Sequence, residues 1–209
     1  MVKQSLRDMK KEETWHVLAR TSFELALEKG LDGFTIEDVV QRARYSRRTF
    51  ANHFSCKEEA VSMGILSLSG ASGDLHREDI LREVESAPHE SPVEALRQWM
   101  KMKFTANLLR ELRELVVLSK AYPTLEPYVL NVLHRLQAAA QTELDRLCGG
   151  RCPQGYTHIL AGAVFGAVMS ILDGDIDVQI PGEAPREGAG TMAFDDFLEM
   201  TFGYLKKGF

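Results

Sequence analysis

The sequence predicts an all-α protein of about nine helices, divided into a small N-terminal three-helix domain and a larger helical domain. Three observations support this prediction. Apolar residues recur at helical spacing along most of the 209 residues, alternation typical of strands is nearly absent, and start and stop signals for helices follow one another closely. The chain is long enough to bury a sizeable core.

Composition narrows the class of protein. With 44% hydrophobic and 26% charged residues the chain reads as globular, and no signal peptide is evident at its start. The odd count of three cysteines argues against a disulfide framework and points to a reducing cytoplasm. The longest apolar run, Ile159 to Leu172, is shorter than the roughly 20 residues of a membrane span. We therefore expect a buried helix there and no membrane partner.

The first predicted helix runs from about Lys10 to Lys29. Apolar residues from Trp15 to Ala26 share one face, and charged residues occupy the other. Gly30 follows Lys29 in the position of a C-terminal cap, which ends the helix.

Three short helices are predicted next, and each begins at a capping signal. Thr35 and Asp38 form a Thr-x-x-acid start for a helix over 35–43, and Ser46 starts a helix that reaches about His53. Ser55 and Cys56 compete as the next start, and Ser55 is favoured because cysteine is a poor acceptor. That helix continues to about Ser69.

The remaining helices are separated by loops rich in Gly, Pro and Ser. A boundary is predicted at 69–73, residues 173–190 read as a long acidic loop, and no sheet is expected. The predicted helical stretches are 74–85, 92 to about 105, about 107–121, 124–148, 154–172 and 192–206.

The helices over 35–43 and 46–53 have the spacing of a helix-turn-helix, because only Arg44 and Tyr45 separate them. In that motif the second helix enters the major groove of DNA. Arg47 and Arg48 suit bidentate contacts to guanine, and Asn52 suits adenine. The hydroxyl groups of Thr35, Ser46 and Thr49 suit phosphate oxygens.

Charge and aromatic patterning agree with a nucleic-acid surface. The chain carries a net charge of −5, yet from Gln41 to Lys57 there are five cations and no carboxylate. An acidic protein can keep a local basic surface, because salt screens charges beyond about 8 Å. Phe50 and Phe54 are four residues apart, so they share a helical face that we expect to be buried.

The segment from about Trp15 to Ile65 resembles the DNA-binding domain of TetR-type transcriptional regulators. The matching residues are Thr35-Ile-Glu-Asp-Val-Val, Ser46-Arg-Arg-Thr-Phe, His53-Phe54 and Lys57-Glu-Glu. Arg44, Ala51 and Cys56 depart from the family pattern, which often has Gly, Tyr and Ser there. Arg44 carries a strain cost if its φ is positive.

The resemblance implies a domain division at 1–56 and 57–209, with ligand binding and dimerisation in the second part. It implies a cytoplasmic homodimeric regulator, expected to be a repressor, that binds a palindromic double-stranded operator and is released by a small apolar or amphipathic effector. The helix that starts near 57 would couple the two domains. The candidate DNA-binding residues are Thr35, Arg44, Tyr45, Ser46, Arg47, Arg48, Thr49, Asn52, His53 and Lys57.

Two further sets of residues carry weaker predictions. Trp99, Met102 and His134 are candidates for lining an effector pocket, since Met and aromatic side chains suit an adaptable apolar site. Small residues at helical spacing followed by an aromatic last helix suggest a dimer interface, which would otherwise be packing within the chain. Its candidate residues are Gly162, Gly166, Ser170, Phe197 and Phe202.

No enzyme, cofactor or metal is predicted, because the sequence carries no catalytic triad, phosphate-binding glycine loop or convincing set of metal ligands. Two alternatives stay open. One is a helical small-molecule-binding or enzymatic protein whose helix-turn-helix is vestigial, and the other is a regulator controlled by a protein partner. A redox role for Cys56, or for Cys148 with Cys152, is also left open.

Overall fold

The computed structural model describes residues 6–66, 92–103, 105–183 and 190–207, and it divides into two compact units. The first unit comprises Met1–Asp74 and Val117–Val132, and the second comprises Leu75–Val116 and Leu133–Phe209. The predicted division at residue 56 stays a prediction, although the structure groups the helix after it with the first unit.

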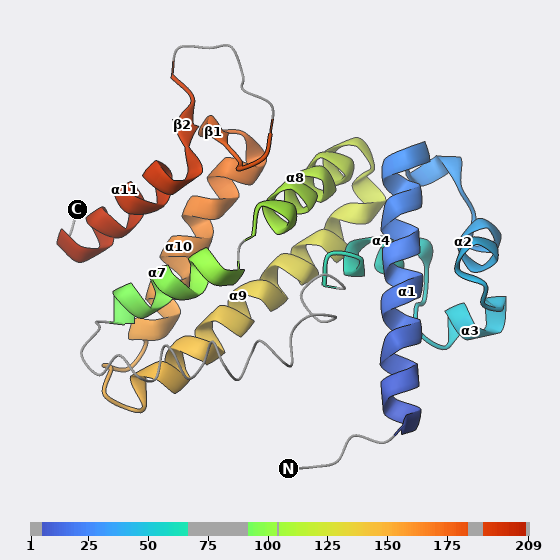
Figure 1. Ribbon diagram of the computed structural model, residues 1–209, viewed down its shortest axis with the longest axis horizontal. Helices are drawn as coiled ribbons and strands as arrows, with labels where there is room; N and C mark the ends of the chain where they lie inside the picture. Colours follow the sequence, from blue (N-terminus) through green and yellow to red (C-terminus); the bar gives the residue numbers. More distant parts are fainter. Residues whose placement is uncertain (1–5, 67–91, 104, 184–189, 208–209) are drawn as a thin grey trace. The chain divides into compact units, whose positions relative to one another are not determined.

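Nine α-helices account for most of the described residues, which confirms the all-α prediction (Figure 1). Two short 3-10 turns, η1 (Leu31–Gly33) and η2 (Pro123–Leu125), join them. The helices are α1 (Leu6–Lys29), α2 (Ile36–Ala43), α3 (Arg47–Ala51), α4 (Lys57–Met63), α7 (Pro92–Lys103), α8 (Ala106–Ala121), α9 (Glu126–Cys148), α10 (Tyr156–Asp173) and α11 (Phe194–Lys207).

Most predicted helices are found within a few residues of their expected bounds. The first begins four residues earlier than expected, and α3 ends at Ala51 rather than near His53. The boundary at 69–73, the stretch over 74–85 and the loop over 86–91 lie outside the described residues.

The first unit is built on a close contact between α1 and α4. A side-chain carbon at Gly64, which caps α4, would lie 2.4 Å from Phe23 Cβ and 2.9 Å from the Ala19 carbonyl oxygen. Phe23 and Ala19 are fully buried. The absence of a side chain at Gly64 therefore lets the two helices approach closely.

The second unit contains α10, the most apolar helix of the described part of the chain. Its 18 residues have a mean hydropathy of 1.4, which meets the length and composition of a membrane span, although 39% of them are buried within the protein. Leu160, Val164, Val168 and Ile171 recur at helical spacing and are buried. A core helix of this kind gives the same hydropathy signal as a membrane span, so the signal alone is weak.

A small sheet corrects the prediction that no strand is present. Val178–Gln179 (β1) and Met192–Ala193 (β2) pair in parallel. β1 lies in the region expected to be an irregular loop, and β2 takes the first two residues of the last predicted helix. Arg113 explains the order there, because its guanidinium lies 2.8 Å from Glu183 and donates to the Val178 carbonyl at 3.1 Å. This largely buried ion pair between Arg113 and Glu183 fixes the backbone around β1. The sequence gives no local sign of the pair.

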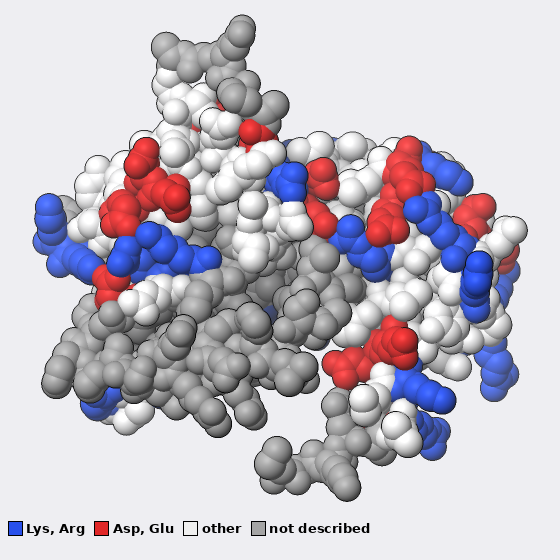
Figure 2. Space-filling view, in the orientation of Figure 1, with Lys and Arg blue, Asp and Glu red and all other residues white. Residues whose placement is uncertain are grey.

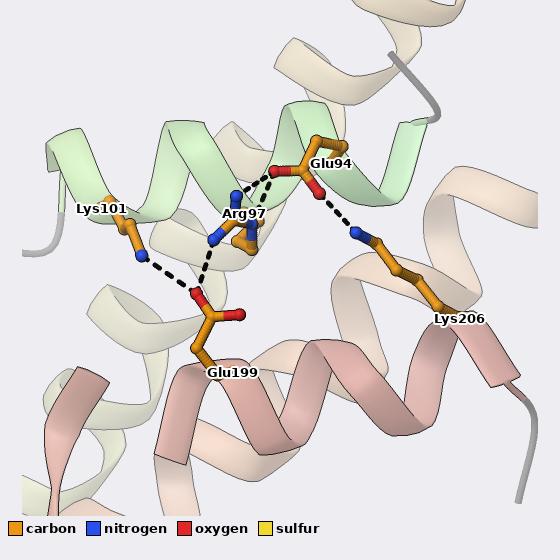
Figure 3. A network of polar contacts seen from close by, with 5 residues as sticks. All are labelled: Glu94, Arg97, Lys101, Glu199 and Lys206. Carbon is orange, nitrogen blue, oxygen red and sulfur yellow. Dashed lines mark hydrogen bonds and ion pairs between the residues drawn. The ribbon is translucent and has the colours of Figure 1, made fainter. Parts of the chain in front are cut away.

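A polar network joins α7 to α11 in the second unit (Figure 3). Arg97 donates to Glu94 on its own helix and to Glu199 of α11 at 2.6 Å, while Lys206 of α11 bonds back to Glu94. Lys101 lies 3.2 Å from Glu199. Hydrogen bonds from Arg97 first, and then from Lys206, hold the pKa of the Glu94 carboxyl below its usual value.

Cys148 and Cys152 form a disulfide across the turn between α9 and α10, with their Cα atoms 5.7 Å apart. The odd cysteine count argued against this, but a single bond needs only two of the three residues. Cys56 is a free thiol. The bond closes a loop of a few residues and therefore constrains the turn rather than the fold as a whole.

Candidate nucleic-acid interface

The start of α2 is fixed by a reciprocal capping box. Thr35 accepts a hydrogen bond from the Asp38 backbone N–H at 3.3 Å, and the Thr35 backbone N–H donates to the Asp38 carboxylate at 2.7 Å. Bonds from the Thr35 hydroxyl and backbone hold the pKa of the Asp38 carboxyl below its usual value. The predicted cap is thus confirmed, and the Thr35 hydroxyl is engaged by Asp38.

The turn between α2 and α3 passes through Arg44, whose φ of 60° places it in the left-handed region. Among the described residues no other side-chain-bearing residue has a positive φ. The Tyr45 backbone N–H donates to the Val40 carbonyl at 2.9 Å, which closes the turn. Arg44 therefore occupies a backbone position that favours glycine, and it places an exposed guanidinium beside the next helix.

The short helix α3 begins at Ser46, whose hydroxyl accepts from the Thr49 backbone N–H at 3.0 Å. Phe50 and Phe54 are 2% and 3% exposed, and their ring centroids lie 5.5 Å apart. The ring of Trp15 on α1 lies 5.8 Å from that of Phe54. The aromatic face of α3 is buried as predicted, so its other face is turned to solvent.

The solvent face of this region carries Arg44, Arg48 and Asn52, all exposed. No hydrogen-bond partner for the side chains of Arg44, Arg48 or Asn52 is found among the described residues. Figure 2 shows Lys and Arg gathered along the edge of the molecule where α2 and α3 lie. Arg47 is also exposed but pairs with Glu37 of α2, so it must exchange that carboxylate for any other ligand.

Lys57 and Cys56 stand at the start of α4 and contact the rest of the first unit. The Lys57 ammonium donates to the Leu31 carbonyl at 2.6 Å and lies over the Phe34 ring, so it ties η1 to α4. Cys56, rather than Ser55, caps α4, because both the backbone N–H and the hydroxyl of Ser55 donate to the Glu59 carboxylate. The expectation for Ser55 is therefore corrected.

Cys56 also contacts residues 117–132, the second segment of the first unit. Its thiol donates to the Tyr128 hydroxyl at the start of α9, with 3.2 Å between the two atoms. The bond with Cys56 raises the pKa of the Tyr128 phenol. Nearby, the Tyr122 hydroxyl lies where a side chain at Gly30 would stand. The segment over 117–132 thus contacts both the end of α1 and the start of α4.

His53 and Lys11 form an edge of this surface that the sequence did not reveal in full. His53 is half-buried, and burial first, then the nearby charge of Lys11, lowers the pKa of its imidazole. Lys11 lies one helical turn before Trp15, which contacts Phe54, so the start of α1 adds an exposed cation beside α3. Helical spacing from Trp15 is the signal that could have indicated it.

The residues predicted to line a ligand pocket or a dimer interface differ in how exposed they are. His134 is exposed on α9, and the side chains of Trp99 and Met102 lie outside the described part. Phe197 and Phe202 are each 1% exposed within one chain, whereas nothing lies within 4 Å of a side chain built at Gly166. The partly exposed hydroxyl of Ser170 donates to the Gly166 carbonyl, and Gly162 lies near Gln137.

Comparison with known proteins agrees with the geometry of the first unit. Residues 18–61 match the family described as bacterial regulatory proteins, tetR family. No curated protein gives a significant match. A solved structure from Mesorhizobium loti MAFF303099, described as a TetR-family transcriptional regulator, is 16% identical, with a TM-score of 0.54 over 94% of this chain and 95% of that chain. At this identity the likeness shows the fold alone, and that fold extends over both units.

Proposed function

We propose that this chain, a DNA-binding transcriptional regulator of the TetR family, acts in the cytoplasm as a homodimeric repressor of a palindromic operator. A small apolar or amphipathic effector that binds the second unit would release it from DNA. The observation that carries the proposal is that Arg48 of α3 and Asn52 at its C-terminal cap are exposed and have no partner among the described residues, while Phe50 and the nearby Phe54 are buried.

The roles of the surface residues follow from their contacts. Arg48 and Asn52 read base edges in the major groove, since their side chains are uncommitted and lie on one side of α3. Arg44, the Ser46 and Thr49 hydroxyls, Tyr45 and His53 contact the phosphates around it. Thr35 and Lys57 also hold the helices in place, since the Thr35 hydroxyl bonds to Asp38 and the Lys57 ammonium bonds to the Leu31 carbonyl.

Dimerisation through α10 and α11 is supported by the apolar residues that one chain leaves exposed. Ile159 of α10 is 72% exposed and Tyr204 of α11 is 52% exposed, and Gly166 presents an open, side-chain-free surface. Two copies would place two recognition helices on successive turns of DNA, about 34–36 Å apart. Gly166→Arg should break the dimer while leaving the monomer fold intact, and sedimentation equilibrium measures this.

Coupling to the effector would pass along α9. This helix carries Tyr128, which bonds to Cys56 at the start of α4, and further along it carries residues of the second unit. An effector must bind better to the state that does not fit DNA, since equal affinity for both states would shift nothing.

Selection from random duplexes with the full-length chain tests the proposal. We expect enrichment of a two-fold symmetric sequence with half-sites one turn apart, or multiples of it. If no sequence is enriched, the helix-turn-helix does not read DNA and the proposal is wrong. If single half-sites are enriched, a monomer binds DNA, and the proposal that the chain binds its operator as a homodimer is wrong.

A further inference from the structure

Residues of three helices, all in the second unit, line a partly open apolar cavity of about 20 Å³, roughly the room that one water molecule needs. Each helix contributes residues three or four positions apart, which is a single helical face. The lining residues are Leu96 and Met100 of α7; Leu136, Gln137 and Ala140 of α9; and Ala161, Val164, Phe165 and Val168 of α10.

The wall of this cavity contains no charged side chain, and Gln137 is its polar member. The Gln137 amide has no hydrogen-bond partner among the described residues. An ion placed here would lose its hydration without gaining a counter-charge, which is strongly unfavourable. An uncharged guest avoids this cost, and a single polar group on it would satisfy the amide.

The exposure of the lining residues distinguishes the closed end of the cavity from its mouth. Leu96, Met100, Ala161, Val164 and Val168 are at most 5% exposed and form its closed end. Leu136, Gln137, Ala140 and Phe165 are partly exposed and form its mouth. The amide therefore stands at the entrance, so a guest would enter with its apolar end first and keep its polar group at the mouth.

The empty cavity is too small for a drug-sized molecule, so binding must enlarge it. Met100 is unbranched and adapts its shape readily, and Phe165 at the partly exposed mouth can turn outward. Enlargement costs part of the binding free energy, so a compact ligand of modest affinity fits these walls better than a large one.

We propose that this cavity binds an uncharged, compact, mainly apolar molecule whose single hydrogen-bonding group pairs with Gln137. Alcohols, ketones and aromatic amines belong to this class. That this molecule is the effector rests on the function proposed above, whereas its binding to the cavity does not.

The probe for a direct test is 1-aminonaphthalene, a compact amine that is uncharged at neutral pH and whose emission shifts in apolar surroundings, added to the full-length protein. Its sulfonated relative 5-aminonaphthalene-1-sulfonate has the same rings and one negative charge. We expect the amine to bind at least 10-fold more tightly than the sulfonate. In competition, 1-decanol should displace the amine, and decanoate at pH 8 should not.

Two neighbouring alanines on α9 provide a matched pair of variants. Ala140 lines the cavity and Ala139 is exposed outside it. Ala140→Leu should raise the Kd of the amine at least 10-fold, while Ala139→Leu leaves it unchanged. Gln137→Leu should raise that Kd several-fold. This second variant tests the cavity independently if Ala140→Leu lowers the thermal unfolding midpoint of the protein.

Equal effects of the two alanine variants, or equal binding of amine and sulfonate, would overturn the cavity proposal. Operator binding is measured separately in a gel-shift assay with and without 1-decanol. If the cavity variants behave as expected but 1-decanol leaves the operator complex intact, the cavity binds ligand and the effector role fails. If no operator is bound at all, the proposed function fails while the cavity proposal stands.

Discussion

The short helices of the first unit and the long helix α10 of the second unit begin in different ways. In the first unit the short helices α2, α3 and α4, of eight, five and seven residues, each start at a side chain that accepts a backbone N–H. In the second unit α10, of 18 residues, starts at Gly155 with no side-chain cap. Short helices gain little from propagation, so α2, α3 and α4 depend on caps and tight turns, whereas α10 depends on its buried face.

The contact between α1 and α4 is where the first unit is most vulnerable. Gly64→Ala places a methyl group against Phe23 and the Ala19 carbonyl oxygen, so we expect it to lower the free energy of unfolding by about 2–3 kcal/mol. Gly203→Ala in α11 is the matched control, because nothing lies within 4 Å of the added carbon. That variant should raise stability by up to about 1 kcal/mol through helix propensity. Urea unfolding measures both, and equal effects would contradict the close-packing argument.

Arg48→Ala tests whether the helix-turn-helix of the first unit recognises specific bases of DNA. We expect a loss of about 1–3 kcal/mol of discrimination at one base position of each half-site, with little change in stability. Arg42→Ala is the contrasting variant, because Arg42 makes a two-bonded pair with Glu28 at 2.6 and 2.7 Å. It should lower stability and leave discrimination unchanged. Competition binding with single-base operator variants measures discrimination, and a uniform loss with Arg48→Ala would make Arg48 a phosphate contact.

The same difference between the units explains what the sequence could predict. Caps such as Thr35 and Ser46 are local signals, so the helix-turn-helix, its buried Phe50 and its exposed Arg48 followed from spacing alone. The pair of Arg113 and Glu183 joins residues 70 positions apart, and nothing local predicts it or the small sheet beside it.

In the candidate site, too, the contacts of single residues depend on distant parts of the chain and could not be predicted from the sequence. The bond from the Lys57 ammonium to the Leu31 carbonyl joins residues 26 positions apart, and nothing local predicts it. Lys11 was missed because its closeness to His53 depends on how α1 packs. Likewise, the cavity wall combines residues from three helices, and Gln137 had no signal of its own.

Glu94→Gln tests the distant polar pairs of the second unit. At pH 7 it should lower the free energy of unfolding by about 1 kcal/mol, since the carboxylate accepts from Arg97 and Lys206. The pKa of Glu94 is lowered in the folded protein, so its contribution is complete above its unfolded pKa of about 4.3. That contribution is lost as the pH falls through the folded pKa.

The difference between wild type and Glu94→Gln should therefore shrink as urea unfolding is repeated from pH 7 towards pH 3. Glu143→Gln is the control, because Glu143 pairs with Arg146 one turn away on the same helix. A local pair of this kind contributes only about 0.2–0.5 kcal/mol. A difference for Glu94→Gln that does not change with pH would show that packing, rather than charge, is responsible.

Arg44→Gly separates backbone strain from charge in the helix-turn-helix. The left-handed backbone at Arg44 favours glycine, so we expect the free energy of unfolding to rise by about 1 kcal/mol. If Arg44 contacts a phosphate as proposed, operator affinity should fall at the same time. Arg44→Asn, which tolerates this backbone better than arginine does, should weaken DNA binding equally with a smaller gain in stability. Unchanged operator affinity in both variants would remove Arg44 from the interface.

Lys11→Ala has the smallest expected effect and tests how far the DNA surface extends along α1. If Lys11 neutralises one phosphate, the variant lowers the slope of log affinity against log salt by about 0.9 for each subunit and leaves base preference unchanged. Lys207→Ala, which removes the same charge from α11, should leave the slope as it is. Because the Lys11 charge lowers the pKa of His53, the variant should also move that pKa upward, which NMR titration of the imidazole measures. A raised pKa with an unchanged salt slope would place Lys11 beside His53 but outside the DNA contact, and the recognition surface would then end at α3.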